Sequence, residues 1–254
     1  HTLRGVAHAV RSIRSLPVLL AATLTLAVAS ASAVVAAPID EGGSATASAR
    51  RIGNQVSTKP LPPAPTATYR VTIISDWTSA SHPTTLPFNS HFSPTVIANH
   101  GVPGDMFVVG ALASPGIEQM AETGATGTLR AELGARATVT EVRTGTSIFG
   151  AGQQSFDVVA GRGDDLISVV TMLAPSPDWF VGVRDVALLG ADGWVDRIEL
   201  DLGNYDAGTD SGTGFRSPNA DTNPAQVISG PRDAAFAQAA AEGRFGRVII
   251  QQIS

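Results

Sequence analysis

The chain of 254 residues has no cysteine and a single lysine, Lys59. Without cysteine it can form no disulfide bond, no thiolate metal site and no cysteine nucleophile. This absence does not place the protein inside a cell, because an exported domain large enough to bury its own core folds without disulfides. Charged residues make up only 15% of the chain and the formal net charge is −5, so there is no basic surface for a phosphate backbone. We therefore expect no nucleic-acid partner.

The N-terminal residues have the pattern of an export signal. Arg4, Arg11 and Arg14 precede an apolar run over residues 16–29, and small residues follow up to residue 37. A membrane anchor is the alternative, but the small residues favour a signal peptide over residues 1–37 that is cleaved on export. We therefore expect a secreted, extracellular protein. Loss of the three arginines would change the formal charge from −5 to −8, and such an acidic surface suits cation binding.

A linker and one domain account for the rest of the chain. Residues 38–67 are polar or proline-rich, and such a composition does not offset the entropy lost on ordering. Residues 68–254 contain many short apolar segments between turn formers, which predicts an all-β fold, an antiparallel β-sandwich with one or two short helices. The predicted strands cover residues 69–75, 105–112, 129–136, 138–144, 155–160, 166–173, 180–189, 194–202 and 245–253, where 129–136 and 138–144 are two strands or one interrupted strand. The predicted helices cover residues 116–124 and 231–242. Residues 155–160 and 166–173, with a turn at 161–164, form the clearest predicted hairpin.

The densest group of acidic residues lies in a glycine-rich segment, residues 201–212. Asp206 and Asp210 are four residues apart there, and Asp178 follows the Pro-Ser-Pro run at residues 175–177. A hard cation such as Ca²⁺ takes about six to eight oxygen ligands, and the glycines would let both loop carboxylates turn inward, with Asp178 as a third ligand. The spacing is not that of an EF-hand. An ordinary Asp/Gly turn, capped by its own side chains, explains the same pattern equally well.

Two longer motifs resemble those of a known family. Residues 175–183 read PSPDWFVGV and residues 206–212 read DAGTDSG, and both are similar to signature motifs of the spondin domain, which F-spondin and mindin contain. The resemblance extends from about residue 69 to residue 253. Further matches fall in the same order, among them Trp77 with His82-Pro83, His91-Phe92-Ser93-Pro94, Met120-Ala121-Glu122, Trp194 and Phe215-Arg216-Ser217-Pro218-Asn219.

This resemblance implies a fold, a ligand and a role. It implies a β-sandwich similar to membrane-targeting C2 domains, one bound Ca²⁺ with Asp178, Asp206 and Asp210 as ligands, and extracellular adhesion or recognition. The chain lacks the cysteines of the animal proteins and their flanking thrombospondin-type or reelin-like modules. The animal partners, integrins and matrix, therefore do not transfer to it, and we expect an unidentified extracellular protein or glycan as ligand.

Histidine, arginine and tryptophan residues give weaker signals. His82, His91 and His100 are nine residues apart, too far for one metal-binding element, and we expect hydrogen-bonded loop anchors. An Arg-Gly-Asp tripeptide at residues 162–164 lies at a predicted turn, where these residue types also occur by coincidence. The tryptophans are expected in the core or as pillars of loops, with one of them, Trp179, as a wall of the ion site.

Two alternatives compete with a calcium-stabilised recognition module. A C2-like lipid binder would use calcium to bridge to anionic headgroups, but Arg216 is the only basic residue of the acidic loop, so we do not expect membrane association. A metal-assisted hydrolase would need a general base beside the ion, and the sequence offers no dedicated one. A Ser/His/Asp triad is not expected either, because no G-x-S-x-G motif is present. The favoured function is therefore binding without catalysis.

Overall fold

The computed structural model describes residues 65–254 of the chain. The signal peptide expected at residues 1–37 and almost all of the linker expected at residues 38–67 lie outside the described residues. Strand β1 (Thr66–Ser75) begins within the last residues of that expected linker. No helix in the described part is long and apolar enough to cross a membrane.

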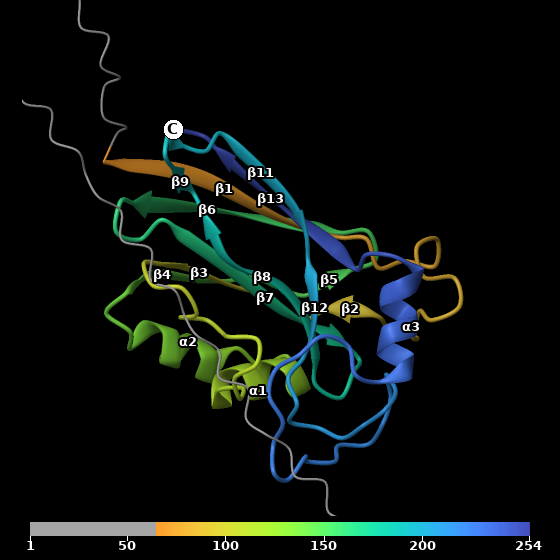
Figure 1. Cartoon of the computed structure of the whole chain (residues 1–254). Helices are drawn as coiled ribbons and strands as arrows, with labels where there is room; N and C mark the ends of the chain where they lie inside the picture. The colour runs from red at the N-terminus through yellow and green to blue at the C-terminus, as the bar shows by residue number, and fades with distance from the viewer. Residues whose placement is uncertain (1–64) are drawn as a thin grey trace, which may run out of the picture. The chain divides into compact units, whose positions relative to one another are not determined.

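Two antiparallel sheets form the domain (Figure 1). The first has the order β11-β13-β1-β6, and the second has the order β12-β8-β7-β2-β5, with β3 pairing both β7 and β4. All of these pairings are antiparallel, which confirms the predicted β-sandwich. The strand bounds are Gln153–Gly161 (β6), Arg197–Asp201 (β11) and Gly246–Gln252 (β13) in the first sheet, and His91–Phe92 (β2), Val96–His100 (β3), Val139–Thr144 (β4), Ile148–Phe149 (β5), Leu166–Ala174 (β7), Trp179–Ala187 (β8) and Gly203–Asp206 (β12) in the second; Leu189–Gly190 (β9) and Gly193–Trp194 (β10) pair as a short ribbon.

The main core lies between the two sheets and follows from residue alternation in the strands. In β1, Tyr69, Val71 and Ile73 are buried while Arg70 is exposed, because successive side chains point to opposite faces of a sheet. These three side chains belong to one buried cluster with residues of β6 and β13 and with residues of β3, β7 and β8 from the second sheet. The first sheet therefore has one buried and one solvated face.

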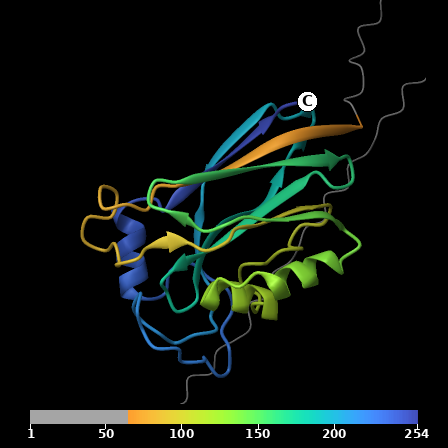
Figure 2. The ribbon, with the colours of Figure 1, turned by 180° about the vertical axis from the view of Figure 1, so that it is seen from behind.

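The second sheet is buried on both faces, because two helices cover its outer side. Helices α1 (Pro115–Thr123) and α2 (Gly127–Gly134) lie beside each other against this sheet (Figure 2). Strand β7 between the two layers is almost entirely buried, which explains its nearly continuous apolar sequence. The second buried cluster joins the helices to the sheet through Ile117, Met120, Ala121, Leu129 and Leu133 from the helices and Val96, Ala98, Val170, Met172 and Phe180 from the strands.

Two predicted strands are wrong. Residues 105–112 form a loop. Gly104 just before it and Gly110 within it adopt φ values of +85° and +89°, and glycine reaches this left-handed region without strain and turns the chain there. Residues 129–136 fall largely in helix α2. Leu129 and Leu133 are four residues apart and both buried, a helical spacing that the strand prediction overlooked.

The predicted hairpin of residues 155–160 and 166–173 is also wrong. The turn at 161–164 exists, with an isolated bridge between Gly161 and Asp164, but β6 pairs with β1 whereas β7 pairs with β2, β3 and β8. The chain passes from one sheet to the other at this turn (Figure 1). Alternation predicted both strands correctly, but it does not say which strand each one pairs with, since non-local burial decides the pairing.

Both predicted helices are present, and α2 is a third. Helix α1 ends at Gly124, which caps it with φ +71°, as expected for a left-handed glycine cap. Helix α3 (Ala234–Glu242) follows Asp233 and ends before Gly243, three residues shorter at its start than predicted. The short strands β2, β3 and β12 were not predicted, because none of them has enough residues to show a clear alternation.

Candidate functional site

Strand pairing brings the two acidic motifs together. Asp178 immediately precedes β8, and Asp206 ends β12, where its partner across the ladder is Trp179. The Asp178 side chain reaches into the loop after β12, where its Oδ2 atom accepts hydrogen bonds from the backbone N–H groups of Thr209 (2.8 Å) and Asp210 (3.2 Å). The structure thus places the three predicted aspartates in one region, although they come from two separate segments.

All three carboxylates are buried, and backbone groups hold them. Asp178 is 0%, Asp206 3% and Asp210 7% exposed. Asp206 Oδ1 accepts a hydrogen bond from the N–H of Gly208 (2.9 Å), and Asp210 Oδ1 accepts one from the N–H of Gly212 (2.6 Å). These are the bonds of ordinary Asp/Gly turns, so a cation site needs support beyond the shape of the loop.

Gly208 is the residue that lets the chain turn between the two loop aspartates. Its φ is +76°, and a Cβ atom added to it would lie 2.5 Å from the carbonyl oxygen of Gln226. Any other residue would meet both a strained backbone and a clash with a fixed carbonyl group. The glycine-rich composition of the loop is therefore a structural requirement at this position.

Burial and mutual repulsion disfavour the charged state of two carboxylates. Burial, and secondly the charge of Asp178, raise the pKa of Asp206 to about 6. Arg232 opposes this rise, because its Nη1 atom lies 2.6 Å from Asp206 Oδ1. Burial also raises the pKa of Asp178, and the charge of Asp210 adds to the rise, while hydrogen bonds from the loop backbone lower it. Arg232 therefore compensates only part of the buried negative charge.

The donor atoms fit a hard cation in their chemistry, but they are not assembled around one point. Asp178 Oδ1 is buried and has no hydrogen-bond partner among the described residues, which is rare for a buried carboxylate oxygen. A pocket of about 150 Å³ lies beside Asp206, Asp210, Arg232 and Asp233. No three His, Cys, Asp or Glu side chains within residues 65–254 are arranged to hold a metal ion. The positive charge of Arg232 lies where a cation would otherwise balance Asp206.

Sequence reasoning missed two residues of this site, Glu122 and Arg232. Glu122 lies in the last turn of α1 and hydrogen-bonds the Thr209 side chain; burial raises its pKa, and the charges of Asp210 and Asp178 contribute. The sequence places Glu122 in a predicted helix and in a motif similar to the spondin domain, without linking it to the acidic loop, and Arg232 lies outside that loop. No local motif marks either residue, because each reaches the site through tertiary packing.

Trp179 lies on the core side of the aspartates, which confirms the expected core position. The residue is fully buried. Its ring stacks on Phe236 of α3 with centroids 4.6 Å apart and planes 8° from parallel, and it meets Phe215 edge-on at 5.0 Å. The three rings therefore connect β8, α3 and the loop that carries Asp210.

The other sequence candidates have structural contacts. His91 Nδ1 lies 2.8 Å from the carbonyl oxygen of Asn89, and His100 Nδ1 lies 3.0 Å from that of Val102, the anchoring roles that the sequence predicted. His100 Nε2 is 2.8 Å from Ser168 Oγ, but both residues are fully buried. This Ser–His pair is therefore closed to a substrate.

The Arg-Gly-Asp tripeptide holds the turn between the sheets. Asp164 Oδ2 accepts hydrogen bonds from Thr140 Oγ1 (2.7 Å) and Asn99 Nδ2 (3.2 Å), and its Oδ1 accepts one from the N–H of Gly161 (3.1 Å). The carboxylate is thus engaged within the domain. These contacts support the interpretation that the tripeptide occurs by coincidence.

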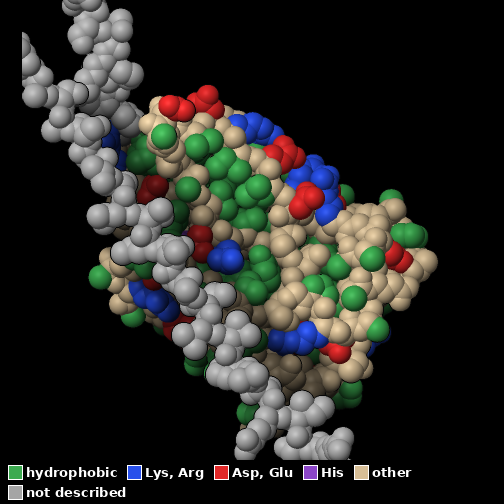
Figure 3. All heavy atoms as spheres, viewed as in Figure 1, with side chains coloured by type: hydrophobic (Ala, Val, Ile, Leu, Met, Phe, Trp, Pro, Cys, Tyr) green, Lys and Arg blue, Asp and Glu red, His purple; other side chains and the backbone are tan. Residues whose placement is uncertain are grey.

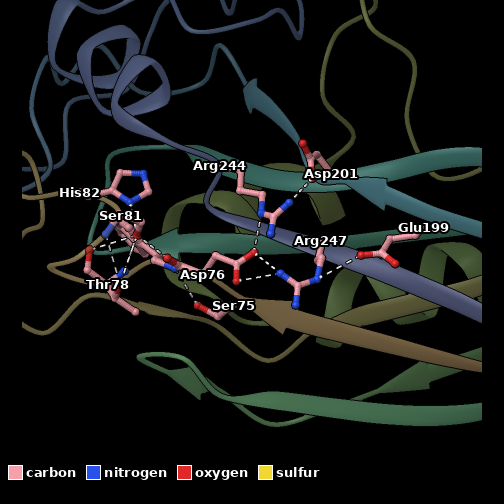
Figure 4. Close-up of polar contacts among 10 residues, drawn as sticks. Ser75, Asp76, Thr78, Ser81, His82, Glu199, Asp201, Arg244 and Arg247 are labelled. Carbon is pink, nitrogen blue, oxygen red and sulfur yellow. Dashed lines mark hydrogen bonds and ion pairs between the residues drawn. The ribbon is translucent and has the colours of Figure 1, made fainter.

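A charged network lies at the end of the first sheet that is nearest to α3. Asp76 receives bonds from Arg247 Nη1 (3.0 and 2.9 Å) and Arg244 Nε (2.7 Å), and these arginines also reach Glu199 and Asp201 (Figure 4). Acidic and basic side chains alternate over the edge strand β11 and its neighbour β13 (Figure 3). Since partly exposed ion pairs contribute little to stability, this network mainly balances charge on that edge.

His82 lies beside this network and should make stability depend on pH. It is buried, its ring stacks on Phe245 at 4.8 Å, and its Nδ1 atom lies 2.9 Å from Ser81 Oγ (Figure 4). Burial lowers the pKa of His82, so the folded state favours the neutral ring. The stability that this gives is present above the unfolded pKa of about 6.5 and is lost as pH falls through the lower folded pKa.

We expect the free energy of unfolding of the unmodified chain to fall relative to that of His82→Gln between neutral and mildly acidic pH. The raised pKa of Asp206 acts in the opposite direction in both proteins, because its protonation favours the folded state as pH falls, so the difference between the two proteins carries the His82 contribution. Urea titrations of both proteins at matched pH values measure this difference. Parallel pH profiles for the two proteins would show that His82 does not cause the loss.

Comparison with known proteins places the chain in a family. The Spondin_N family model matches residues 67–240. Spondin-1 of Gallus gallus is 34% identical over 175 residues, covering 64% of this chain and 22% of that protein. Spondin-2 of Homo sapiens is 33% identical over 171 residues, covering 64% of this chain and 52% of that protein. The chain thus spans about a fifth of spondin-1 and about half of spondin-2. The matched residues include nearly all of β1, the helices α1 and α2 and all three aspartates of the site, and the chain belongs to the Spondin_N family.

Proposed function

We propose that this chain is an extracellular recognition module whose acidic loop binds one Ca²⁺, with Asp178, Asp206 and Asp210 as protein ligands. The observation that carries the proposal is the state of Asp178. It is fully buried, one of its oxygens has no hydrogen-bond partner in the described part, and burial and the charge of Asp210 raise its pKa. Burial makes this carboxylate costly to ionise, and a cation beside it would stabilise the ionised form.

The three carboxylates would have to converge to hold such an ion, and each of two of them has an oxygen available for it. Backbone N–H groups already orient one oxygen of Asp178 and one of Asp206, which leaves the other oxygen of each available. Ca²⁺ would supply the positive charge that these carboxylates lack. Asp178 precedes β8 and Asp206 ends β12, so shared ligation would fix the two ends of these strands together and order the loop between residues 207 and 224.

Recognition of an extracellular protein or glycan is the role that fits this arrangement. The buried aspartates serve to order loops, and no exposed general base lies among them. The signal peptide expected at residues 1–37 supports export, and the resemblance of the two acidic motifs to the spondin domain implies recognition without catalysis. We propose a non-catalytic module whose partner contacts loops that calcium keeps in place.

Isothermal titration of the full chain with CaCl₂ after chelator treatment tests the proposal. We expect one site per chain with a Kd of about 10⁻⁴–10⁻³ M, the range of extracellular modules, and no measurable binding in Asp206→Asn. Asp157→Asn is the matched control, because Asp157 is exposed and pairs with Arg70 on the first sheet. Equal calcium affinity in Asp206→Asn and Asp157→Asn would refute the ligand assignment.

One observation favours the lipid-binding alternative. Val108, Val109, Leu112 and Val227 are between 40% and 61% exposed, and Leu112 bridges to Val227, two residues before the Ser229 that pairs with Asp206. An apolar surface beside a calcium loop can enter the boundary of a membrane. Calcium-dependent sedimentation with vesicles of phosphatidylserine, lost in Leu112→Ser, would assign the module to a lipid surface instead of a protein or glycan.

A further inference from the structure

A groove of about 550 Å³ separates helix α2 from strand β4. One wall consists of Gly127, Ala131 and Gly134 of the helix, and the other consists of residues 139–142 of the strand. It lies on a different part of the fold from the three aspartates and shares no lining residue with the pocket beside them. The calcium proposal makes no use of it.

Strand β4 has an open edge toward this groove. Among the described residues it pairs only with β3. The N–H of Gly145 donates to the carbonyl oxygen of Thr95 over 2.8 Å, which shows which residue pairs of β3 and β4 are hydrogen-bonded. Because hydrogen-bonded and non-hydrogen-bonded pairs alternate in antiparallel sheets, Val142 and Thr144 direct their N–H and C=O groups away from β3. Such an edge is a template for another strand.

The helix wall leaves room for a chain along that edge. A Cβ atom added to Gly127 or Gly134 would meet no atom within 4 Å. Packing therefore does not require glycine at these positions, and the missing side chains leave the groove open. Arg130 also lines the groove, and it makes no ion pair with any residue of the described part. Glu141 on the opposite wall is already paired with Arg143. The groove therefore offers backbone groups, space and one uncompensated positive charge.

We propose that this groove binds an extended peptide segment of a partner protein, which adds to β4 as an antiparallel or parallel strand and places a carboxylate against Arg130. Backbone hydrogen bonds to the strand edge would give affinity, and the carboxylate would give selectivity, as in other strand-addition complexes. The occupant is a peptide with an acidic side chain or a free C-terminal carboxylate. Binding does not need calcium, so this proposal and the calcium proposal can fail separately.

Selection from a display library of random peptides, about six to ten residues long to match a strand, tests the proposal on the full chain. We expect enriched peptides to contain Asp, Glu or a required free C-terminus, and to bind equally in calcium and in chelator. Val142→Pro removes an N–H that faces the groove, which an edge strand tolerates, and it should weaken binding by at least about tenfold. Gly134→Leu should do the same by filling the groove, and Arg130→Gln should weaken acidic peptides selectively.

Val159→Pro is the matched control. Val159 lies on β6, another edge strand, opposite Thr68 of β1. The N–H and C=O groups of Thr68 bond to residues 253 and 254 at the end of β13, so Thr68 and Val159 form a non-hydrogen-bonded pair. The backbone N–H of Val159 therefore faces away from β1, as that of Val142 faces away from β3. Circular dichroism and thermal unfolding check that each variant is folded. If Val142→Pro does not fold, Gly134→Leu still tests the groove. The proposal is overturned if no peptide is enriched, or if enriched peptides bind Gly134→Leu as well as Val159→Pro. A concentration-dependent dimer that Gly134→Leu abolishes would assign the edge to a second copy of this chain and would also overturn it.

Discussion

Replacement of Trp179 by alanine is expected to lower the free energy of unfolding by about 3–5 kcal/mol, the usual cost of removing a fully buried aromatic side chain. Trp179 is 0% exposed, stacks on Phe236 and contacts Phe215. Its removal would leave a cavity between β8 and α3 that the surrounding strands cannot close, because paired strands are held at fixed spacing. Chemical denaturation followed by circular dichroism measures the loss.

Trp194→Ala is the comparison for this prediction. Trp194 is only partly buried and packs edge-on against Tyr69, with ring centroids 6.3 Å apart. It should therefore cost distinctly less than Trp179→Ala. Calcium affinity should also fall in Trp179→Ala and not in Trp194→Ala, since Trp179 is the ladder partner of Asp206. Equal losses of stability in the two variants would contradict the central position that we assign to Trp179.

Two substitutions of Asp178 are expected to differ clearly in their effect on stability. Asp178→Ala leaves the N–H groups of Thr209 and Asp210 without their buried acceptor, which costs about 1–3 kcal/mol for an unsatisfied buried group. Asp178→Asn keeps an acceptor oxygen and removes a charge that burial and the charge of Asp210 disfavour. In chelator, Asp178→Asn should therefore be at least as stable as the unmodified chain, and Asp178→Ala clearly less stable.

The same pair separates a cation ligand from a turn-forming residue. If Asp178 only caps the loop, Asp178→Asn should behave like the unmodified chain with and without calcium. If Asp178 is a ligand, calcium should stabilise the unmodified chain and leave Asp178→Asn unchanged. Urea titrations of the three proteins, each in chelator and in calcium, give the six values that decide between these roles. A calcium response in Asp178→Asn as large as in the unmodified chain would remove Asp178 from the site.

Much of the fold could be predicted from local patterns, and the errors have specific physical causes. The alternation in β1 and the apolar run of β7 each reflect a burial pattern that a single strand carries in its own sequence. The hairpin error at residues 161–164 arose because strand partners depend on contacts between distant segments. The helix at α2 was missed because Leu129 and Leu133 are the only buried residues of an eight-residue element, which shows too few turns for its period to stand out.

The candidate site was predicted in part for a similar reason. Asp206 and Asp210 share one loop, and Asp178 lies in a distinctive motif, so sequence reasoning could name all three. Arg232 and Glu122 come from the segments before α3 and within α1, and only the packed structure brings them to the loop. Arg232 also changes the expectation, because it balances part of the charge that the sequence assigned to a cation alone.

Thermal unfolding of the full chain in chelator and in calcium at several millimolar tests the calcium proposal most directly. A ligand that binds only the native state at about 100 times its Kd stabilises that state by about 2.7 kcal/mol. We predict a saturable rise in Tm with calcium that is absent in Asp206→Ala and present in Asp157→Asn. No rise in the unmodified chain, after metal analysis has shown that the chelated protein is free of calcium, would mean that the acidic loop is an ordinary turn held by its own hydrogen bonds and by Arg232.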